Sequence, residues 1–303
     1  MNLRRLHTFV SREKAFQHDD VLQETVIFHA VKGSKLARVT VTSSNGPDDL
    51  SPTSRIVDYD QVVRPDDPQA FIHIPTNPFA DEVVERLSAC QTTLADLGLA
   101  VSTGRVVDFR AREYLRDQQG KDTVPLIWQA HFVDGYITWP KQGARKPQAF
   151  VDADAVRSQL VPNDAYVLTR RFSAKEERRR IVAAVHDPTR IETKMIAFEN
   201  HLNYFHRNGS GIGLRLARGL AVFLNSTLVD QYFRQFSGHT QVNATDLRNM
   251  RYPTQKQLQR IGSKVGKDFP DQDVVDTLLA RELFGAKNGT SPARRPERNG
   301  RRE

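Results

Sequence analysis

The sequence predicts a mixed α/β protein, because β-rich runs and amphipathic helical patterns alternate along its 303 residues. Two β-rich runs, 22–31 and 36–42, stand near the start, and apolar residues recur at helical spacing from 214 to 236. Hydrophobic residues make up 39% of the chain, which is enough for a buried core. We therefore expect a folded protein with room for two domains of ordinary size.

The first 45 residues are expected to form the edge of a larger sheet and not a complete domain. The runs 22–31 and 36–42 are joined by Lys32, Gly33 and Ser34, which is the pattern of an antiparallel hairpin. An isolated hairpin is only marginally stable in water. It must therefore pair or pack with the rest of this chain or with another chain.

The remaining chain divides into a linker, a mixed domain, a last helix and a tail. Residues 46–95 are the linker, since 45–68 is rich in proline and aspartate and lacks apolar periodicity. Ser173 with Glu176, and Asn243 with Asp246, have the spacing of helix capping boxes. The linker is expected to contain strands at 56–59 and 71–74 and a helix at 81–90. The mixed domain, 96–262, is expected to contain strands at 105–109, 124–132, 136–139, 165–172 and 195–204 and helices at 175–185, at 214–236 and after Asn243. A last helix is expected at 274–283, within 263–285, and a disordered basic tail at 286–303.

The charge balance favours a protein that touches a polyanion on one face. The chain has 44 basic and 36 acidic residues and a net charge of +8. About half of this excess lies in the tail after Gly285, so the body is only mildly basic. A single cysteine, Cys90, excludes an internal disulfide, and no apolar run has the length of a signal or membrane segment. We expect a cytoplasmic protein without a membrane partner.

The most informative stretch is a polar loop between residues 237 and 245. Amide, hydroxyl and imidazole groups crowd into it, and arginines flank it on both sides. Such groups donate and accept hydrogen bonds at base edges, while guanidinium groups suit phosphates or guanine. The loop therefore predicts sequence reading on DNA. Its polar members are Ser237, His239, Thr240, Gln241, Asn243 and Thr245, and the flanking arginines are Arg234, Arg248 and Arg251.

Three further clusters have the chemistry of nucleic-acid contacts. The basic cluster at 170–180 has an alternative explanation as a solvated helix face, because Glu176 and Glu177 can pair with part of it. The polar cluster at 200–207 mixes base-reading and stacking groups, and its alternative is a satisfied polar core. The clusters are Arg105, Arg110, Arg112 and Arg116; Arg170, Arg171, Lys175 and Arg178 to Arg180; and Asn200, His201, Asn203, Tyr204, His206 and Arg207.

Catalytic motifs are weak by comparison. Gly209, Gly211 and Gly213 precede a helix, but their spacing misses the dinucleotide-binding pattern, and a plain turn explains them better. Asp187, Glu192 and Lys194 could form the metal-binding and lysine set of a nuclease, although the first spacing is short. The nine histidines show no metal-ligand spacing with Cys90. We predict no catalytic residue and no metal site.

Four stretches of the sequence are distinctive. They are FVSREKAFQHDDVLQETVIF at 9–28, LGLAVSTGRVVDFR at 97–110, ENHLNYFHRNG at 199–209 and ARGLAVFLNSTLVDQYFRQFSGHTQVNATDLRNMRYP at 217–253. These stretches resemble the C-terminal half of adenine-specific DNA methyltransferases of restriction-modification systems. In that family a Rossmann-like domain binds S-adenosylmethionine through a glycine-rich loop and holds the target adenine with an Asn-Pro-Pro-Tyr/Phe motif. A separate target recognition domain reads the DNA sequence. Here only Asn77, Pro78 and Phe79 approach that motif, and the second proline is missing.

The resemblance implies separate roles for the parts of the enzyme. The hairpin would complete a methyltransferase sheet, and residues 96–262 would be the target recognition domain. S-adenosylmethionine is implied for the complete enzyme, with none bound by this chain alone, and the methyl group would be transferred by a catalytic subunit or a missing N-terminal half. An autonomous DNA adenine methyltransferase and a metal-dependent endonuclease remain alternatives.

The resemblance implies that the chain binds double-stranded DNA. Phosphate contacts are expected from Arg105, Arg110, Arg112, Arg170, Arg171 and Lys175. Base contacts are expected from His201, Asn203, His206, His239, Gln241 and Asn243, with Tyr204, Arg207 and Arg234 as further DNA-binding residues.

Overall fold

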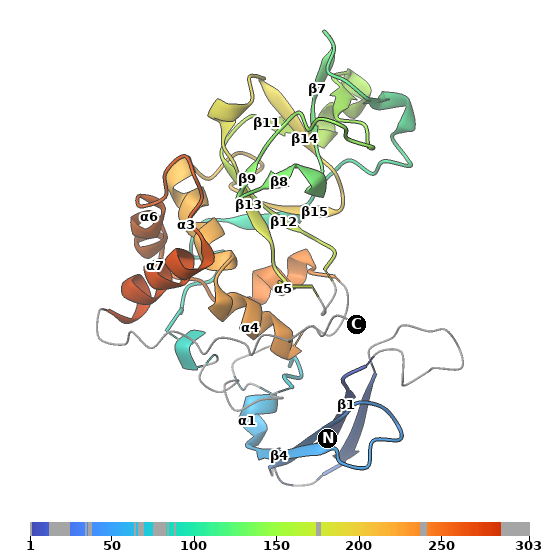
Figure 1. Cartoon of the computed structure of the whole chain (residues 1–303), viewed down its shortest axis with the longest axis vertical. Coiled ribbons are helices and arrows are strands. Elements are labelled where there is room, and N and C mark those ends of the chain that lie inside the picture. The colour runs from blue at the N-terminus through green and yellow to red at the C-terminus, as the bar shows by residue number, and fades with distance from the viewer. Residues whose placement is uncertain are drawn as a thin grey trace, which may run out of the picture.

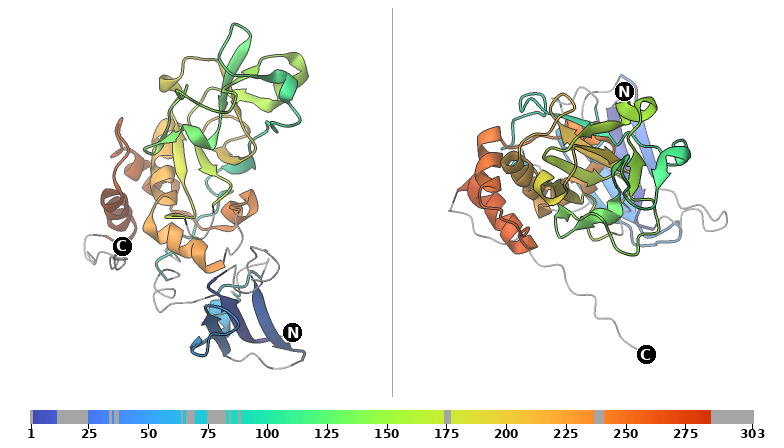
Figure 2. Two further views of the ribbon diagram at one scale, coloured as in Figure 1. Left: turned by 45° about the vertical axis from the view of Figure 1, so that its right-hand side comes forward. Right: turned by 90° about the horizontal axis from the view of Figure 1, so that it is seen from above.

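The computed structural model is a mixed α/β protein, as the sequence predicts (Figure 1). The structure describes residues 2–11, 25–33, 35, 38–63, 65, 70–74, 83, 85–87, 89–173, 177–236 and 241–285. A four-stranded sheet lies at one end of the molecule, and two larger sheets with a group of helices form the rest (Figures 1 and 2).

The four-stranded sheet has the strand order β2-β1-β3-β4. Strand β1 runs antiparallel to β2 and parallel to β3. Leu3 and Leu6 of β1 are buried with Val39, Val41 and Val57 in a small core of this sheet. The bounds are β1 Asn2–Phe9, β2 Val26–Val31, β3 Val39–Ser44, β4 Thr53–Val57 and, after the sheet, α1 Tyr59–Val62.

The predicted hairpin of runs 22–31 and 36–42 is wrong in its pairing. Both runs contain a strand, but β1 lies between them and pairs with each. The physical reason is that β1 supplies the buried Leu3 and Leu6 to the core, whereas β2 contributes only the partly buried Ala30 and exposes its other side chains. The consequence is that β2 becomes an edge strand.

The six-stranded sheet is the middle layer of the larger part. Along β12 the side chains alternate between its two faces. Val167 packs toward the helices, whereas Tyr166 and Leu168 pack toward the five-stranded sheet, where they meet Phe198. The layers are therefore helices, six-stranded sheet and five-stranded sheet.

Strand order is β5-β15-β12-β13-β9-β8 in the six-stranded sheet and β11-β14-β7-β10-β6 in the five-stranded sheet. The strands are β5 Ala100–Thr103, β6 Leu115–Arg116, β7 Thr123–Ile127, β8 Phe132–Val133, β9 Tyr136–Ile137, β10 Ala149–Val151, β11 Leu160–Pro162, β12 Tyr166–Arg170, β13 Ala183–His186, β14 Met195–Phe198 and β15 Leu202–His206. The helices are α3 Leu214–Leu224, α4 Thr227–Phe236, α5 Ala244–Asn249, α6 Gln255–Gly262 and α7 Gln272–Phe284, with short 3₁₀ turns at Arg112–Tyr114, Gln129–His131, Asp154–Gln159 and Pro188–Arg190.

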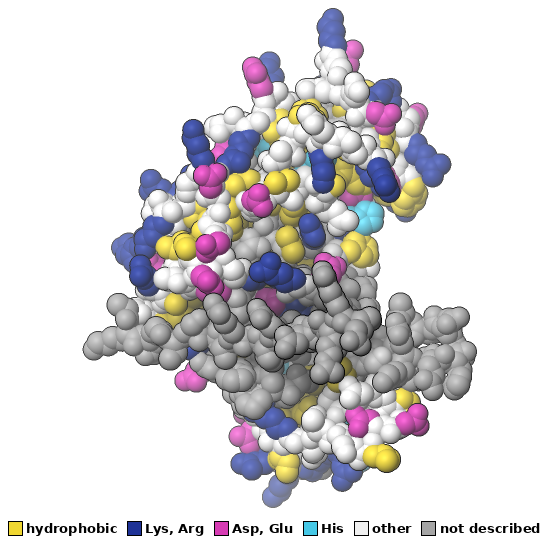
Figure 3. Space-filling view, in the orientation of Figure 1, with side chains coloured by type: hydrophobic (Ala, Val, Ile, Leu, Met, Phe, Trp, Pro, Cys, Tyr) yellow, Lys and Arg dark blue, Asp and Glu magenta, His cyan; other side chains and the backbone are white. Residues whose placement is uncertain are grey.

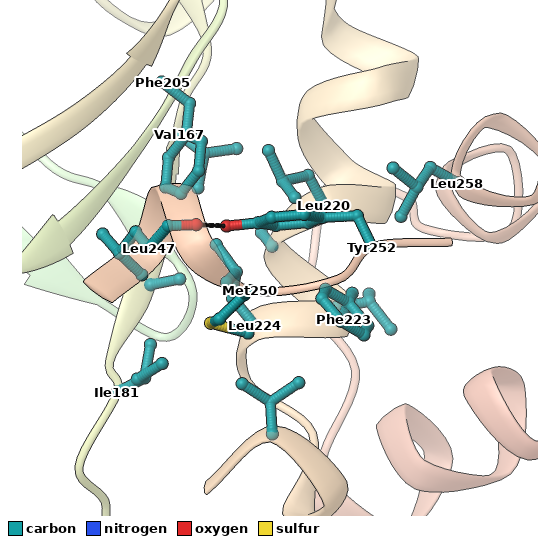
Figure 4. Packing of buried hydrophobic residues seen from close by; sticks show 14 of the residues in the cluster. Val167, Ile181, Phe205, Leu220, Phe223, Leu224, Leu247, Met250, Tyr252 and Leu258 are labelled. Atoms are coloured by element: carbon teal, nitrogen blue, oxygen red, sulfur yellow. Dashed lines mark hydrogen bonds between the residues drawn. The ribbon is translucent and has the colours of Figure 1, made fainter. Parts of the chain in front are cut away.

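The helical layer packs around α3. Leu220 and Phe223 of α3 meet Tyr252, whose hydroxyl donates to the Leu247 carbonyl at 2.5 Å (Figure 4). Gly219 permits α6 to approach closely, because a Cβ there would overlap the Leu258 carbonyl. This layer holds the helix α5, which follows the polar loop, against the middle sheet.

The helix predicted at 175–185 is wrong. Residues 183–186 form β13 in the middle of the six-stranded sheet, where all four side chains are buried. Ser173 does not act as a helix cap, since its hydroxyl donates to the Arg180 carbonyl at 2.7 Å. Tertiary burial of the apolar segment around Ile181 overrides the local helical preference.

Several other predicted elements divide or shift. The strand 124–132 becomes β7 and β8 with a 3₁₀ turn between them, the strand 56–59 shifts to β4, and the strand 71–74 makes only a bridge at Ile72. The strand 195–204 is two strands, β14 and β15, which lie in different sheets. The helix 214–236 breaks between α3 and α4, where the Asn225 side chain exchanges hydrogen bonds with the Ala183 backbone at 2.9 and 3.0 Å. The strand next to Gly104 precedes it as β5, whereas 105–109 makes only a bridge at Val106.

Other predictions are confirmed or fall outside the described residues. The last helix is α7, and Asn243 with Asp246 forms the predicted capping box of α5. Residues 83 and 85–87 of the predicted helix 81–90 are helical. Lys175, His239, residues 77–79 and the tail 286–303 lie outside the described residues. Every helix within the described ranges is too short or too polar to cross a membrane.

Candidate nucleic-acid interface

Four chain segments meet where β14 turns into β15. The turn residue Asn200 donates its backbone N–H to the Val106 carbonyl at 2.9 Å, and Arg171 donates to the His201 carbonyl at 2.9 Å. Gly104 lies so close to this turn that a Cβ would overlap the Glu199 carbonyl. The turn is thus fixed by the segment after β5 on one side and the end of β12 on the other.

The polar loop enters this arrangement through its described end. Val242 donates its N–H to the Arg171 carbonyl at 2.7 Å, and Gln241 forms a bridge with Phe172. The buried Asn203 side chain donates to the Val242 carbonyl at 2.8 Å. Residues far apart in sequence, predicted separately as base readers and phosphate binders, are thereby brought together.

The exposed side chains of this region are aromatic, imidazole and guanidinium groups. Phe109 is 60% exposed and Phe172 is 36% exposed, although both are large hydrophobic residues. The ring of Phe172 lies 5.0 Å from that of His201, and Arg171 lies over Phe172 at 5.6 Å. Figure 3 shows an exposed histidine with hydrophobic and basic side chains beside it. We call this surface, made by residues 108–112, 170–172, 201 and 241, the aromatic-basic face.

Two carboxylates lie beside His201. Glu199 is fully buried, and burial raises its pKa, while hydrogen bonds from the His201 ring and backbone oppose that rise. Burial also acts to raise the pKa of Asp108, but hydrogen bonds from Lys146 and the Phe109 backbone lower it below its ordinary value. Asp108 is therefore an ionised partner of Lys146, at 3.1 Å, at the rim of the aromatic-basic face.

The arginines predicted to bind phosphates differ in their surroundings. Arg110 and Arg112 are exposed, and Arg110 lies over the Phe109 ring at 5.4 Å. Arg170 lies over Phe132 at 5.8 Å and is half-buried. The guanidinium of Arg105 is exposed but donates to the Ser158 carbonyl at 2.8 Å. Each of these contacts leaves further N–H donors on the guanidinium group.

Several residues predicted to bind DNA lie inside the protein. Asn203 and Tyr204 are fully buried, because β15 is covered on both faces. His206 is nearly buried; it contacts Ser102 at 2.9 Å, and burial followed by the charge of Arg105 lowers its pKa. In the described structure these side chains support β15 and its neighbours and are not presented at the surface.

The other predicted DNA-binding residues are peripheral. Arg207 is exposed at the far end of β15, about 16 Å from its start at 3.3 Å per residue, and donates to the Gly98 and Leu97 carbonyls. Arg234 pairs with Asp230 at 2.8 Å and contacts the 177–178 backbone. Asn243 is occupied as the cap of α5.

Phe109, Phe172 and Glu199 were not among the predicted site residues. Each of the two phenylalanines adjoins an arginine at the end of a β-rich run, which is a usable sequence signal for an exposed aromatic. Nothing in the sequence distinguishes Glu199 from an ordinary surface acid, since its burial depends on the sharp turn between two sheets.

The predicted nuclease residues do not form a site. Asp187 is buried, caps the turn Pro188–Arg190 by accepting from the Thr189 N–H at 3.1 Å, and pairs with Arg218 at 3.5 Å. Glu192 and Lys194 are exposed. Among the described residues, no group of three histidine, cysteine or acidic side chains is arranged to hold a metal ion. Asp187 thus has a structural role.

The glycine-rich turn before α3 does not fit a cofactor loop. Gly211 donates its N–H to Asp164 at 3.1 Å, and Ile212 donates to the Ala165 carbonyl at 2.9 Å. A Cβ at Gly211 would lie 2.7 Å from the Ala165 carbonyl oxygen. The glycines serve close backbone packing, so no step of catalysis through S-adenosylmethionine is assigned to this turn.

Comparison with known proteins identifies the class to which the chain is related. No family model matches it. It is 46% identical over 283 residues to the type II methyltransferase M.PstI of Providencia stuartii, covering 93% of this chain and 56% of that protein. It is 43% identical over 285 residues to the type II methyltransferase M.BsuBI of Bacillus subtilis, again covering 93% and 56%. The chain is therefore similar, over nearly all of its length, to part of the type II methyltransferases.

More particularly, these matches confirm the predicted resemblance to a C-terminal part of a restriction-modification methyltransferase. It spans about half the length of these curated relatives. The solved structure of the type IIG restriction endonuclease BpuSI matches with a TM-score of 0.49 and 11% identity, over 94% of this chain and 42% of that one. A similarity of that size supports no functional conclusion.

Proposed function

We propose that this chain is the DNA target recognition part of a site-specific adenine-N6 methyltransferase. The observation that carries the proposal is the aromatic-basic face, on which Phe109, Phe172, His201 and Gln241 gather among arginines from separate segments. Guanidinium groups position a duplex through its phosphates, and imidazole and amide groups read base edges. Relatives named as methyltransferases provide the setting in which such a reader would act.

Within this proposal Arg110, Arg112, Arg170 and Arg171 contact phosphates, and His201 and Gln241 contact bases. Arg105, Lys175, His239, Asn243, Arg207 and Arg234 remain proposed DNA contacts at the margins or in the undescribed segments. Asn203, Tyr204 and His206 act by supporting β15. Binding of S-adenosylmethionine and methyl transfer belong to the part of the enzyme that this chain does not span, or to a separate catalytic subunit.

We further propose that the catalytic part docks on the edge strand β2. Ile27 is 55% exposed and Phe28 is 58% exposed, and β2 lies at the edge of its sheet. An exposed apolar edge strand is a template for pairing with another strand. The proposal predicts that the tagged chain co-purifies from its host with a methyltransferase catalytic part, and that Phe28→Lys lowers the recovery of this complex. Recovery of the partner with Phe28→Lys at the wild-type level counts against the docking site.

Selection from a pool of randomised duplexes tests the recognition function. The wild-type chain with its catalytic part is expected to enrich one sequence class. A variant carrying His201→Ala and Gln241→Ala should lose this preference more than it loses affinity, whereas Arg110→Gln with Arg171→Gln should weaken binding to all sequences. The matched control is Arg281→Gln in α7, which removes one exposed charge elsewhere. Enrichment of no sequence by the wild type would refute the function.

Calorimetry with S-adenosylmethionine distinguishes the proposed function from the alternative of an autonomous methyltransferase. The chain alone is expected to bind no cofactor, and the complex is expected to bind it. Binding of S-adenosylmethionine to the chain alone would favour the autonomous enzyme.

A further inference from the structure

Glu199 and His201 form a hydrogen-bonded pair in the tight turn between β14 and β15. The Glu199 side chain is fully buried, whereas the His201 side chain is 43% exposed. One carboxylate oxygen accepts the His201 backbone N–H at 2.9 Å, and the other contacts Nδ1 of the ring. The pair therefore connects a buried carboxylate, which accepts hydrogen bonds, to an exposed imidazole.

This geometry determines which ring nitrogen carries the proton. An ionised carboxylate only accepts hydrogen bonds, so Nδ1 must donate to it. In a neutral imidazole the other nitrogen, Nε2, is then an acceptor. Because Nδ1 is directed at a fully buried group, the exposed edge of the ring is the one that contains Nε2.

Neighbouring groups hold the ring in this orientation. Phe172 lies beside it with the ring planes tilted by 44°. The turn packs against Gly104, whose missing side chain allows the backbone of Glu199 to approach. Asp108 is the other carboxylate that acts on His201, and it is engaged by Lys146. The ring is thus oriented by contacts with Glu199 and Phe172.

We propose that Glu199 is a positioning residue that fixes His201 with Nε2 as a hydrogen-bond acceptor, so that His201 selects a base bearing an exocyclic amine. In the major groove adenine and cytosine present such an amine, whereas guanine and thymine present a carbonyl oxygen. The inference rests on the proposed function of the aromatic-basic face. It adds the polarity of one base contact and the buried residue that sets it.

The substitution Glu199→Gln tests this polarity with almost no change in shape. Its amide oxygen must still accept the His201 backbone N–H, which leaves the amide NH₂ facing Nδ1. Since NH₂ donates, the ring must move its proton to Nε2 and become a donor at the exposed edge. The variant should therefore favour guanine or thymine at the position where the wild type favours adenine or cytosine.

Two measurements at pH 8 test the inference in the complex with its catalytic part. Nitrogen NMR of the histidine rings is expected to find the Nδ1–H form of His201 in the wild type and the Nε2–H form in Glu199→Gln. Selection from randomised duplexes is expected to change the preferred base at one position, by about threefold to tenfold in relative affinity, and to leave other positions unchanged. His201→Ala, a change at an exposed turn residue, should remove the preference at that same position, and serves if Glu199→Gln does not fold.

Each contrary outcome has a distinct meaning. An Nε2–H ring in the wild type overturns the inference, as does equal weakening of all sequences by Glu199→Gln or unchanged preference in His201→Ala. Absence of any sequence preference in the wild type overturns the proposed function and the inference with it.

Discussion

Replacing Arg110 with glutamine should reduce the salt dependence of DNA binding by a defined amount. Arg110, Arg112, Arg170 and Arg171 are the four arginines of the aromatic-basic face. Each phosphate contact contributes about −0.9 to the slope of log affinity against log salt, so four contacts give a slope of about −3.6. Affinity for a random duplex should then fall about 150-fold between about 50 and 200 mM salt, and only about 40-fold in Arg110→Gln.

Fluorescence anisotropy with a labelled duplex of random sequence provides the measurement, because the phosphate contribution does not depend on the recognised bases. The matched control is Arg281→Gln, which makes the same charge change on the exposed side of α7. The control should retain the wild-type slope. Equal slopes in Arg110→Gln and the wild type would refute the assignment of Arg110 to a phosphate, and equal losses in both variants would indicate an effect of overall charge.

Three further predictions concern the scaffold. Gly104→Ala should lower the free energy of unfolding by about 1–3 kcal/mol in urea denaturation, because its Cβ would overlap the Glu199 carbonyl; Gly120→Ala, with no atom within 4 Å of the new Cβ, should be neutral, and equal stabilities would contradict the close packing. Burial raises the pKa of Cys90 to about 12, so its thiol should react with a disulfide reagent at pH 8 only when denaturant unfolds the chain, and fast reaction of the native protein would contradict this. Burial lowers the pKa of His186 to about 4, and the unfolded chain binds the proton first as pH falls below about 6.5. The contribution of His186 to the free energy of unfolding should therefore be about 2 kcal/mol smaller at about pH 5 than at about pH 8, so the pH profile should be flatter in His186→Gln, and an unchanged profile would contradict this.

The sequence predicts the fold class better than it predicts individual elements. Periodicity located α7, and the capping box located the start of α5, because both signals are local. Prediction from local patterns failed at 183–186, where burial in the middle sheet decides between strand and helix. It failed again at the N-terminus, because the choice of β1 as the partner of both neighbours depends on a core assembled from the whole sheet.

For the site, the sequence predicted the polar and basic groups but not which of them reach the surface. His201, Arg171 and Gln241 do meet, through backbone hydrogen bonds between segments that sequence patterns treat separately. The burial of Tyr204 follows from β15 being covered by a sheet on one face and helices on the other. No single-segment pattern contains that information, because a continuous polar-aromatic run has the same composition whether it lies at an edge or in a middle layer.

The burial of Asn203 gives the polar run around β15 a different role from the one its composition suggests. Asn203 donates to the Val242 carbonyl at 2.8 Å and accepts from the Thr103 hydroxyl at 3.2 Å, so it links β5, β15 and the end of the polar loop. A buried amide that is hydrogen-bonded on both its oxygen and its nitrogen fixes the spacing of the groups it joins, since leaving either atom unpaired costs free energy. The exposed His201 lies only two residues away, in the turn that precedes β15. Under the proposed function, base contact and structural support are thus divided within one short segment, with His201 at the surface and Asn203 in the core.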